Sequence, residues 1–160
     1  MTSTVPAATL TVTLTESITL NGVDHGGTNT LSIGSINEVY KRIVTATTTE
    51  TEILSFHASL FGPGQFLNAN VRYIRITNLD DTNNVVLTFK NQDNDECAML
   101  LDKGQSFIFN GDLTNGVQDV INAITAGNVT PTLSSVGDLS NITVWCDTAS
   151  CDIEIFVASI

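Results

Sequence analysis

The chain has 160 residues, of which 42% are hydrophobic and 14% charged, and its formal net charge at pH 7 is -11. A chain of this length suits one domain that buries about two-thirds of the surface its unfolded form would expose. Only six residues are Lys or Arg, whereas binding to nucleic acid needs clustered cations on one surface. We therefore expect no nucleic-acid partner.

The first 17 residues lack the features of a secretory signal. They contain no basic region and no continuous apolar region. No run in the chain approaches the ~18 apolar residues of a membrane span. We expect a soluble protein without a membrane partner, made and kept in a cytoplasm.

The N-terminal quarter of the chain predicts an arm followed by a strand. We expect residues 1–9 to form a loose N-terminal arm and residues 10–160 to form one β-sandwich domain. From Leu10 to Leu20, apolar residues alternate with Thr and Ser, which predicts a half-buried strand. Glu16 interrupts the apolar face, so a bulge or a strand end is expected there. Such a strand near a terminus could also pair with a neighbouring subunit.

Asn21-Gly22 predicts a type I′ hairpin turn, which needs positive φ at both central residues. Further strands are expected at 30–33 and 38–46, with a brief apolar piece at 53–56. Residues 71–110 then hold four short apolar runs separated by three polar turns. Because these turns are short, we expect the four strands to pair in sequence as an antiparallel meander.

The pattern changes after Gly111. Val117, Val120, Ile121 and Ile124 fall at helical spacing, with Asn115 as a cap and Gly127 as a stop, which predicts at most one short helix. A last hairpin is expected from the strands at 142–146 and 151–157. The inventory of eight to ten strands predicts an all-β fold, an antiparallel β-sandwich, of which the jelly roll is one form.

The three cysteines favour structural roles. Cys97 shares a strand face with Met99 and Leu101, so we expect a small buried hydrophobe. Cys146 and Cys151 flank a four-residue turn and could face each other, which leaves both a disulfide and two free thiols open. Zinc would need further Cys or His ligands near this pair, and the sequence has none there.

No metal or cofactor site is predicted. The turn at 93–96 holds three carboxylates, but it lacks the glycine and the distal Glu of a calcium-binding loop. We interpret it as a solvated β-turn. Asp80-Asp81 is interpreted likewise, as a turn in which Asp side chains bond nearby backbone N–H groups.

No catalytic residue is predicted either. His25 and His57 are the only histidines, and no G-x-S-x-G, P-loop or G-x-G-x-x-G motif accompanies them. Trp145, with Asn141 and Asp147 close in sequence, is the one place that could bind a sugar, although packing of Trp145 against the body is an equal alternative. We expect a protein that is not an enzyme.

Several segments resemble small virion structural proteins of tailed bacteriophages, particularly marine and cyanobacterial ones. The main one is Tyr73–Thr82, with the sequence YIRITNLDDT. The others lie at 10–22, 35–44, 102–109 and 151–158, so that the likeness covers most of the chain and is weakest at 113–140.

The resemblance implies a capsid decoration (cement) protein, which binds the outer surface of a phage head and stabilises contacts between capsomers. It further implies a homotrimer, the major capsid protein as partner, and location in the virion after assembly in the host cytoplasm. It provides no catalytic residues. The alternatives are another head-fibre or tail component, or a receptor- or glycan-binding β module.

Overall fold

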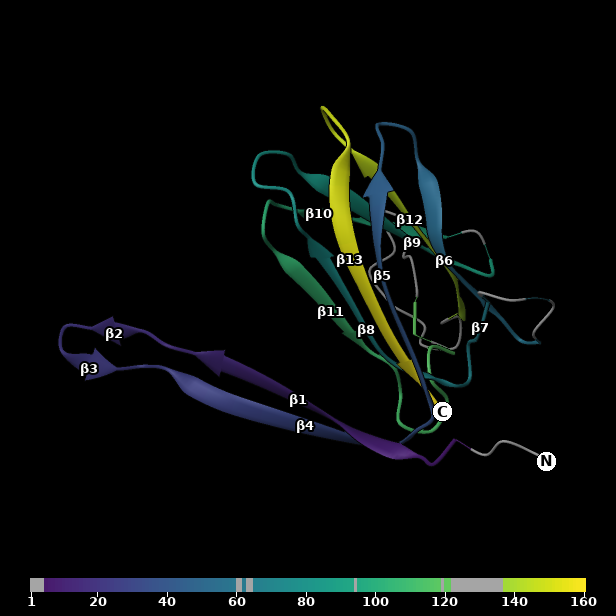
Figure 1. Cartoon of the computed structure of the whole chain (residues 1–160), viewed down its shortest axis with the longest axis horizontal. Helices are drawn as coiled ribbons and strands as arrows, with labels where there is room; N and C mark the ends of the chain where they lie inside the picture. Colours follow the sequence, from purple (N-terminus) through teal and green to yellow (C-terminus); the bar gives the residue numbers. More distant parts are fainter. Residues whose placement is uncertain (1–4, 60–61, 63–64, 94, 119, 122–136) are drawn as a thin grey trace, which may run out of the picture.

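The computed structural model describes residues 5–59, 62, 65–93, 95–118, 120–121 and 137–160. The described chain is all-β, with thirteen strands and no helix (Figure 1). The strands are β1 (Ala8–Glu16), β2 (Thr19–Leu20), β3 (Val23–Asp24), β4 (Gly27–Ile36), β5 (Glu38–Ala46), β6 (Thr51–His57), β7 (Phe66–Leu67), β8 (Val71–Asn78), β9 (Val85–Asn91), β10 (Glu96–Leu101), β11 (Ser106–Asn110), β12 (Leu139–Cys146) and β13 (Cys151–Ser159). The number exceeds the expected eight to ten because β2, β3 and β7 are two-residue strands.

Two sheets form the body of the molecule. Sheet I has the order β11-β8-β13-β5, and sheet II has the order β10-β9-β12-β6-β7. Four antiparallel pairs are nested along the chain: β5 with β13, β6 with β12, β8 with β11, and β9 with β10. This is one long hairpin wound over itself, which is the topology of a jelly roll. The predicted antiparallel sandwich is confirmed, and the jelly roll is the form it takes.

The predicted meander at 71–110 is wrong in its pairing. Only β9 and β10 pair with each other as consecutive strands, whereas β8 and β11 lie together in the opposite sheet. The predicted last hairpin is corrected in the same way, because β12 belongs to sheet II and β13 to sheet I. Alternation shows that each strand has one apolar face. That face is buried equally well when the next strand lies across the sandwich rather than beside it.

The core lies between the two sheets. Its largest fully buried side chains include Ile74, Ile76, Leu87, Ile142, Ile153 and Ile155. Each such side chain stabilises the fold by about 1.5–3 kcal/mol relative to an exposed one.

Asn78, at the end of β8, hydrogen-bonds to two connections that cross from one sheet to the other. It is fully buried, and its Nδ2 donates to the carbonyls of Asn83 at 2.9 Å and Leu101 at 3.3 Å. Its Oδ1 accepts the backbone N–H of Asp80 at 3.0 Å. One amide therefore satisfies backbone groups at both the β8–β9 and the β10–β11 connections, which a buried apolar residue could not do.

The helix predicted after Gly111 is wrong within the described residues. Asp112 Oδ1 accepts the N–H of Asn115 in a tight turn, and the N–H of Val117 donates to Asn68 at 2.7 Å. Ile121 forms a β-bridge with Gly137. The spacing of Val117 and Ile121 reflects two buried contacts with other segments rather than a helical face. Ile124 and Gly127 lie outside the described residues.

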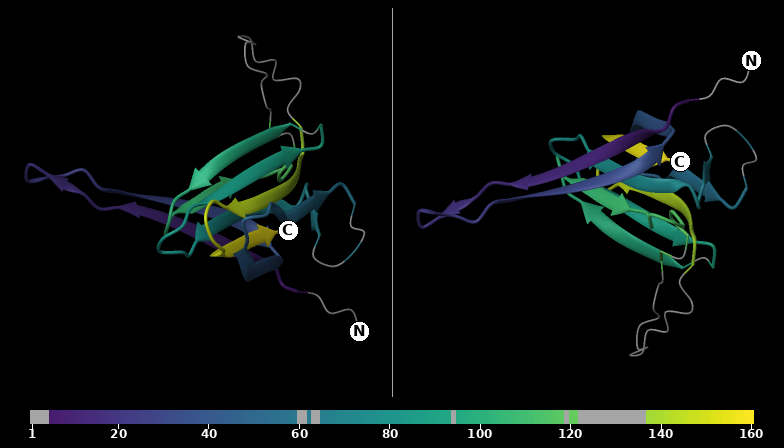
Figure 2. Two further views of the ribbon diagram at one scale, coloured as in Figure 1. Left: turned by 90° about the horizontal axis from the view of Figure 1, so that it is seen from above. Right: turned by 90° about the horizontal axis from the view of Figure 1, so that it is seen from below.

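Residues Ala8–Ile36 form a separate element, here called the projecting hairpin, which leaves one end of the sandwich and extends beyond it (Figures 1 and 2). Asn21 and Gly22 have φ values of 51° and 79°, which confirms the type I′ turn at its tip. β1 ends at Glu16, as expected, but begins at Ala8, so the predicted boundary between residues 9 and 10 falls within this strand.

Candidate interaction surface

The projecting hairpin has one apolar and one hydroxyl-bearing face. In β1 and β4 the cross-strand pairs include Val12 with Leu31 and Leu10 with Ile33, and directly opposed residues point to the same side. The intervening pairs join Thr and Ser residues, such as Thr13 with Thr30. The apolar face is turned toward sheet I, where Leu10, Val12, Leu31 and Ile33 belong to a hydrophobic cluster.

The root of the hairpin is fixed on the outer face of sheet I. Ile33 and Ile36 are buried there against Tyr73 of β8 and Ala158 of β13. The rings of Tyr73 and Phe156 meet edge to face, with centroids 5.9 Å apart. This cluster is separate from the core between the sheets, so it holds the hairpin to the body without taking part in the sandwich.

A bulge lies at this root. The pairing shifts between Ala8, opposite Ile36, and Leu10, opposite Ile33. The extra residue on β4 is accommodated where Ser35 adopts a positive φ of 63°. Because bulges bend a strand and increase its twist, this one helps to set the direction in which the hairpin leaves the body.

The distal half of the hairpin carries exposed apolar side chains. Ile18, Leu20 and Val23 are 53%, 58% and 55% exposed. Leu20 and Val23 are paired across the hairpin, so they form one exposed apolar surface near its tip, and contiguous apolar surface marks interaction sites. An isolated two-stranded hairpin is also only marginally stable in water. The distal half therefore exposes apolar surface and would be stabilised by a partner that covers it.

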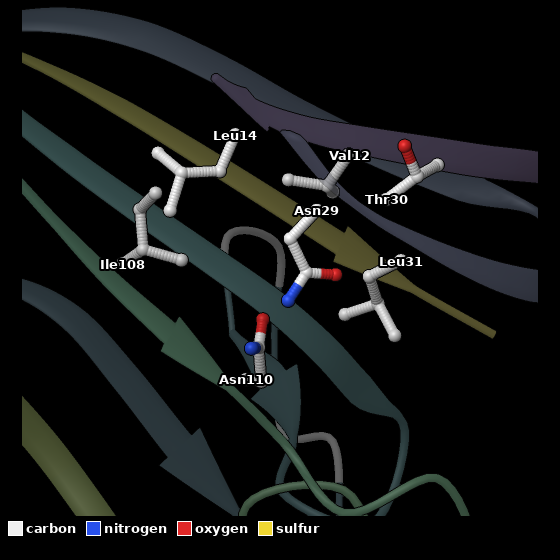
Figure 3. A pocket seen from close by; sticks show the side chains of 7 residues that line it. All are labelled: Val12, Leu14, Asn29, Thr30, Leu31, Ile108 and Asn110. Atoms are coloured by element: carbon white, nitrogen blue, oxygen red, sulfur yellow. The ribbon is translucent and has the colours of Figure 1, made fainter. Parts of the chain in front are cut away.

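Two adjoining hollows, of about 280 and about 340 Å³, lie between the hairpin and sheet I. Both are lined by Val12 and Leu14 from the hairpin and by Ile108 from β11. In Figure 3, Leu14 faces Ile108 across the space, and the amides of Asn29 and Asn110 point toward each other. Ile108 is 40% exposed, so this space is an open apolar recess rather than part of the core.

An ion network borders the recess on the outer face of sheet I. Glu154 accepts hydrogen bonds from Arg75 at 2.5 Å and from Lys41 at 3.0 Å. The hydrogen bond from Arg75 and then that from Lys41 lower the pKa of the Glu154 carboxyl below its usual value. Arg75 also lines the larger hollow, so this apolar recess is bordered by an ion network of two cations and one carboxylate.

A second apolar surface lies on the outer face of sheet II. Pairing places Leu100, Val86 and Trp145 in one row across β10, β9 and β12. Leu100 is 62% exposed, and Val86 and Trp145 are half-buried. We call these three residues the Trp145 row. Trp145 packs on the sheet, and its exposed part contributes to this row. Sugar binding at Trp145 stays a prediction.

Cys97 is exposed, so the prediction of a buried cysteine is wrong. It lies opposite the buried Phe89 and shares its face. However, β10 is an edge strand of sheet II, and its residues from Glu96 to Leu100 are all exposed. A position that points inward on an edge strand is left open where the facing sheet does not reach it.

Cys146 and Cys151 are buried free thiols. The thiol of Cys146 donates to the carbonyl of Ala46 at 3.4 Å, and that of Cys151 to Ala149 at 3.5 Å. Burial, followed by a hydrogen bond with Cys146, raises the pKa of Cys151 to about 12. The two thiols meet across the sandwich rather than within a hairpin.

At Asp80-Asp81, an Asp side chain bonds nearby backbone N–H groups, as predicted. Asp80 Oδ1 accepts the N–H groups of Thr82 and Asn83 at 2.8 and 2.7 Å. Near the predicted turn at 93–96, Asn91 Oδ1 accepts the N–H groups of Asp93 and Asp95. Within the described ranges, no group of three or more His, Cys, Asp or Glu residues could hold a metal ion.

The two histidines lie apart from the recess. The N–H of His25 donates to the carbonyl of Ile18 near the hairpin tip. His57 Nε2 lies 2.8 Å from Ser55 Oγ on β6. In the part of the chain that the structure describes, no helix has the length and apolarity needed to cross a membrane.

Comparison with family models, curated proteins and solved structures found no match to this chain. The function is therefore inferred from the geometry of the two surfaces. Sequence reasoning identified the apolar face of β1 but missed the recess, because Ile108 joins it only through the pairing of β11 with β8.

Proposed function

We propose that this protein is a structural virion protein, and specifically a capsid decoration protein that binds the outer surface of a phage head and stabilises contacts between capsomers. The observation that carries the proposal is the projecting hairpin with its exposed apolar tip. Jelly rolls also recur among viral capsid proteins, but the same fold serves lectins and cupins, so this support is an analogy.

A decoration protein needs one surface for its own copies and another for the shell. The projecting hairpin and the Trp145 row lie on the outer faces of different sheets. We assign the hairpin to self-association, as a homotrimer, and the Trp145 row with the exposed strand β10 to the major capsid protein. A protein that binds the assembled shell but not its separated subunits stabilises the shell by mass action.

Charge supports a role on the exterior of the particle. With a net charge of -11 and only six cations, the subunit is repelled by packaged nucleic acid and remains soluble during assembly in the host cytoplasm. The proposed role needs no catalysis and no cofactor.

The test uses heads of the tailed phage whose genome carries the coding sequence, emptied of DNA and stripped of this protein. Sedimentation with added protein should show saturable binding and a higher temperature of shell disruption. Leu100→Ser should weaken binding at least about tenfold, as expected from loss of one apolar contact. Leu79→Ser is the matched control, because Leu79 is also exposed, at 46%, but lies outside both surfaces.

Absence of binding to such heads, or a coding sequence outside any phage genome, would contradict the proposal. Binding only at the neck or at fibre positions in electron micrographs would move the protein to a head-fibre or tail role instead.

A glycan-binding module is the second candidate, favoured by one observation. Asn141 Oδ1 is buried without a hydrogen-bond partner, on the same strand as the half-buried Trp145. Aromatic rings beside amides are suited to sugars. Binding to a glycan array that Trp145→Ala abolishes would support this role, and an array without bound glycans would remove it.

A further inference from the structure

We infer that the distal half of the projecting hairpin packs into the recess of a second copy of this chain, between that copy's own hairpin and the outer face of its sheet I. This inference rests on the self-association within the proposed function, but it is independent of any binding to a shell.

The distal hairpin is not covered by its own subunit. Ile18, Leu20 and Val23 are each more than half exposed, and all three views show the hairpin tip well beyond the sandwich (Figures 1 and 2). The apolar face of the proximal half already packs on sheet I. The covering of the distal half must therefore come from another molecule.

The recess has the chemistry to provide that cover. Leu14 and Ile108, on its two sides, are 52% and 40% exposed. It continues directly from the contact that the hairpin already makes with sheet I, since Val12 lines the recess and also belongs to the root cluster. A second copy's hairpin tip, packed beside the first copy's hairpin, would extend the apolar contact between that hairpin and sheet I.

Charge favours another copy's hairpin as the occupant. The only Asp, Glu, Lys or Arg residues between positions 5 and 36 are Glu16 and Asp24, both in the distal half. Arg75 lines the recess, and Arg75 and Lys41 share the single carboxylate of Glu154, so this network carries a net charge of +1. An acidic hairpin tip and a network with a net positive charge attract each other, and this specifies orientation as well as contact.

Each copy supplies one hairpin tip and one recess, so the contact can repeat from copy to copy as a heterologous contact. Heterologous contacts form rings when the rotation between copies closes. A ring of three is the assembly that the proposed homotrimer requires.

Cross-linking between two variants tests the inference. Leu20→Cys and Ile108→Cys are made separately, each with Cys97→Ser because Cys97 is an exposed thiol. The two proteins, distinguishable by mass, are mixed and treated with oxidised glutathione. One thiol attacks oxidised glutathione and releases one reduced glutathione. The second thiol then attacks this mixed disulfide and releases another, which leaves a disulfide between the two chains.

The expected result is a disulfide-linked pair containing one chain of each variant. Thr19→Cys is the matched control, since neighbouring strand residues point to opposite sides, and it should cross-link to Ile108→Cys at least about tenfold less. Independently, the double substitution Ile18→Ser with Leu20→Ser should weaken self-association at least about tenfold, as expected from loss of two apolar contacts.

Three outcomes would overturn the inference. An oligomer that neither cross-links nor responds to the double substitution would overturn it and leave the proposed function standing. A parent protein that stays monomeric, with the hairpin variants impaired in shell binding, would show that the hairpin docks on the capsid instead. A monomer that also fails to bind emptied heads would remove the proposed function as well.

Discussion

Leu14 of the projecting hairpin and Ile108 of β11 face each other across an open recess, and both are substantially exposed. Residues that stabilise a subunit are buried in it, whereas residues that stabilise an assembly are exposed in the isolated subunit. This relationship predicts that the two kinds of residue separate in stability measurements.

Ile108→Ala should lower the free energy of unfolding of the isolated subunit by less than about 1 kcal/mol. Ile76→Ala, on the neighbouring strand β8 and fully buried, should lower it by about 2–5 kcal/mol, because it leaves a cavity in the core. Urea denaturation at a concentration where the protein is monomeric measures both values. Equal losses for the two variants would place Ile108 in the subunit core and remove the basis of the recess.

Gly116 should be far less tolerant of substitution than Gly104. Both have positive φ, 67° and 69°, so Ala costs about 1 kcal/mol at either position through backbone strain. A Cβ at Gly116 would also lie 2.3 Å from the carbonyl oxygen of Asn68, whereas one at Gly104 would meet no atom within 4 Å.

We therefore expect Gly116→Ala to lower the free energy of unfolding by at least about 2 kcal/mol more than Gly104→Ala does. Thermal and urea unfolding compare the two variants with the parent. A similar loss for both would mean that the turn before Val117 does not lie against Asn68 as described.

Glu154 should make stability depend on pH in the acid range. Its folded pKa lies below the unfolded value because Arg75 and Lys41 hydrogen-bond to the carboxylate. Its contribution is therefore complete above the unfolded pKa, about 4.3, and is lost as the pH falls through the folded pKa.

Glu154→Gln should cost about 1 kcal/mol near pH 7, as expected for a partly exposed ion network. The difference from the parent should shrink toward zero in strong acid, where the parent carboxyl is also uncharged. Urea unfolding at several pH values measures this difference. A gap that stays constant from pH 7 down to strong acid would show that packing, not charge, is responsible.

The three thiols should differ in reactivity. Cys97 is exposed, whereas Cys146 and Cys151 are buried, and the pKa of Cys151 is raised to about 12. Because the thiolate is the reactive form, a disulfide reagent at mildly alkaline pH should modify one thiol in the folded protein and three after denaturation. Cys97→Ser should abolish the fast reaction, and a fast reaction that survives this substitution would contradict the burial of the pair.

Local features of this fold were predictable, and long-range ones were not. The type I′ turn at Asn21-Gly22 and the end of β1 at Glu16 followed from residues within one or two positions of each other. The pairing of β8 with β11 did not, because alternation along each strand is the same whether its neighbour in sequence lies beside it or across the sandwich.

The two clearest errors have the same origin. Val117 and Ile121 have helical spacing, yet their backbone groups bond to Asn68 and Gly137, which are distant in sequence. Cys97 has the pattern of a buried residue, yet it lies on an edge strand. In both cases, segments distant in sequence determine whether the residue is buried and what it bonds to. The recess could not be predicted from the sequence for the same reason.

Native mass spectrometry over a range of concentrations, with the Ile18→Ser and Leu20→Ser double variant beside the parent, tests most directly whether the projecting hairpin joins copies of this chain. We expect a trimer for the parent and a shift toward monomer for the variant. A parent protein that remains monomeric at every concentration would contradict the claim that the projecting hairpin joins copies of this chain.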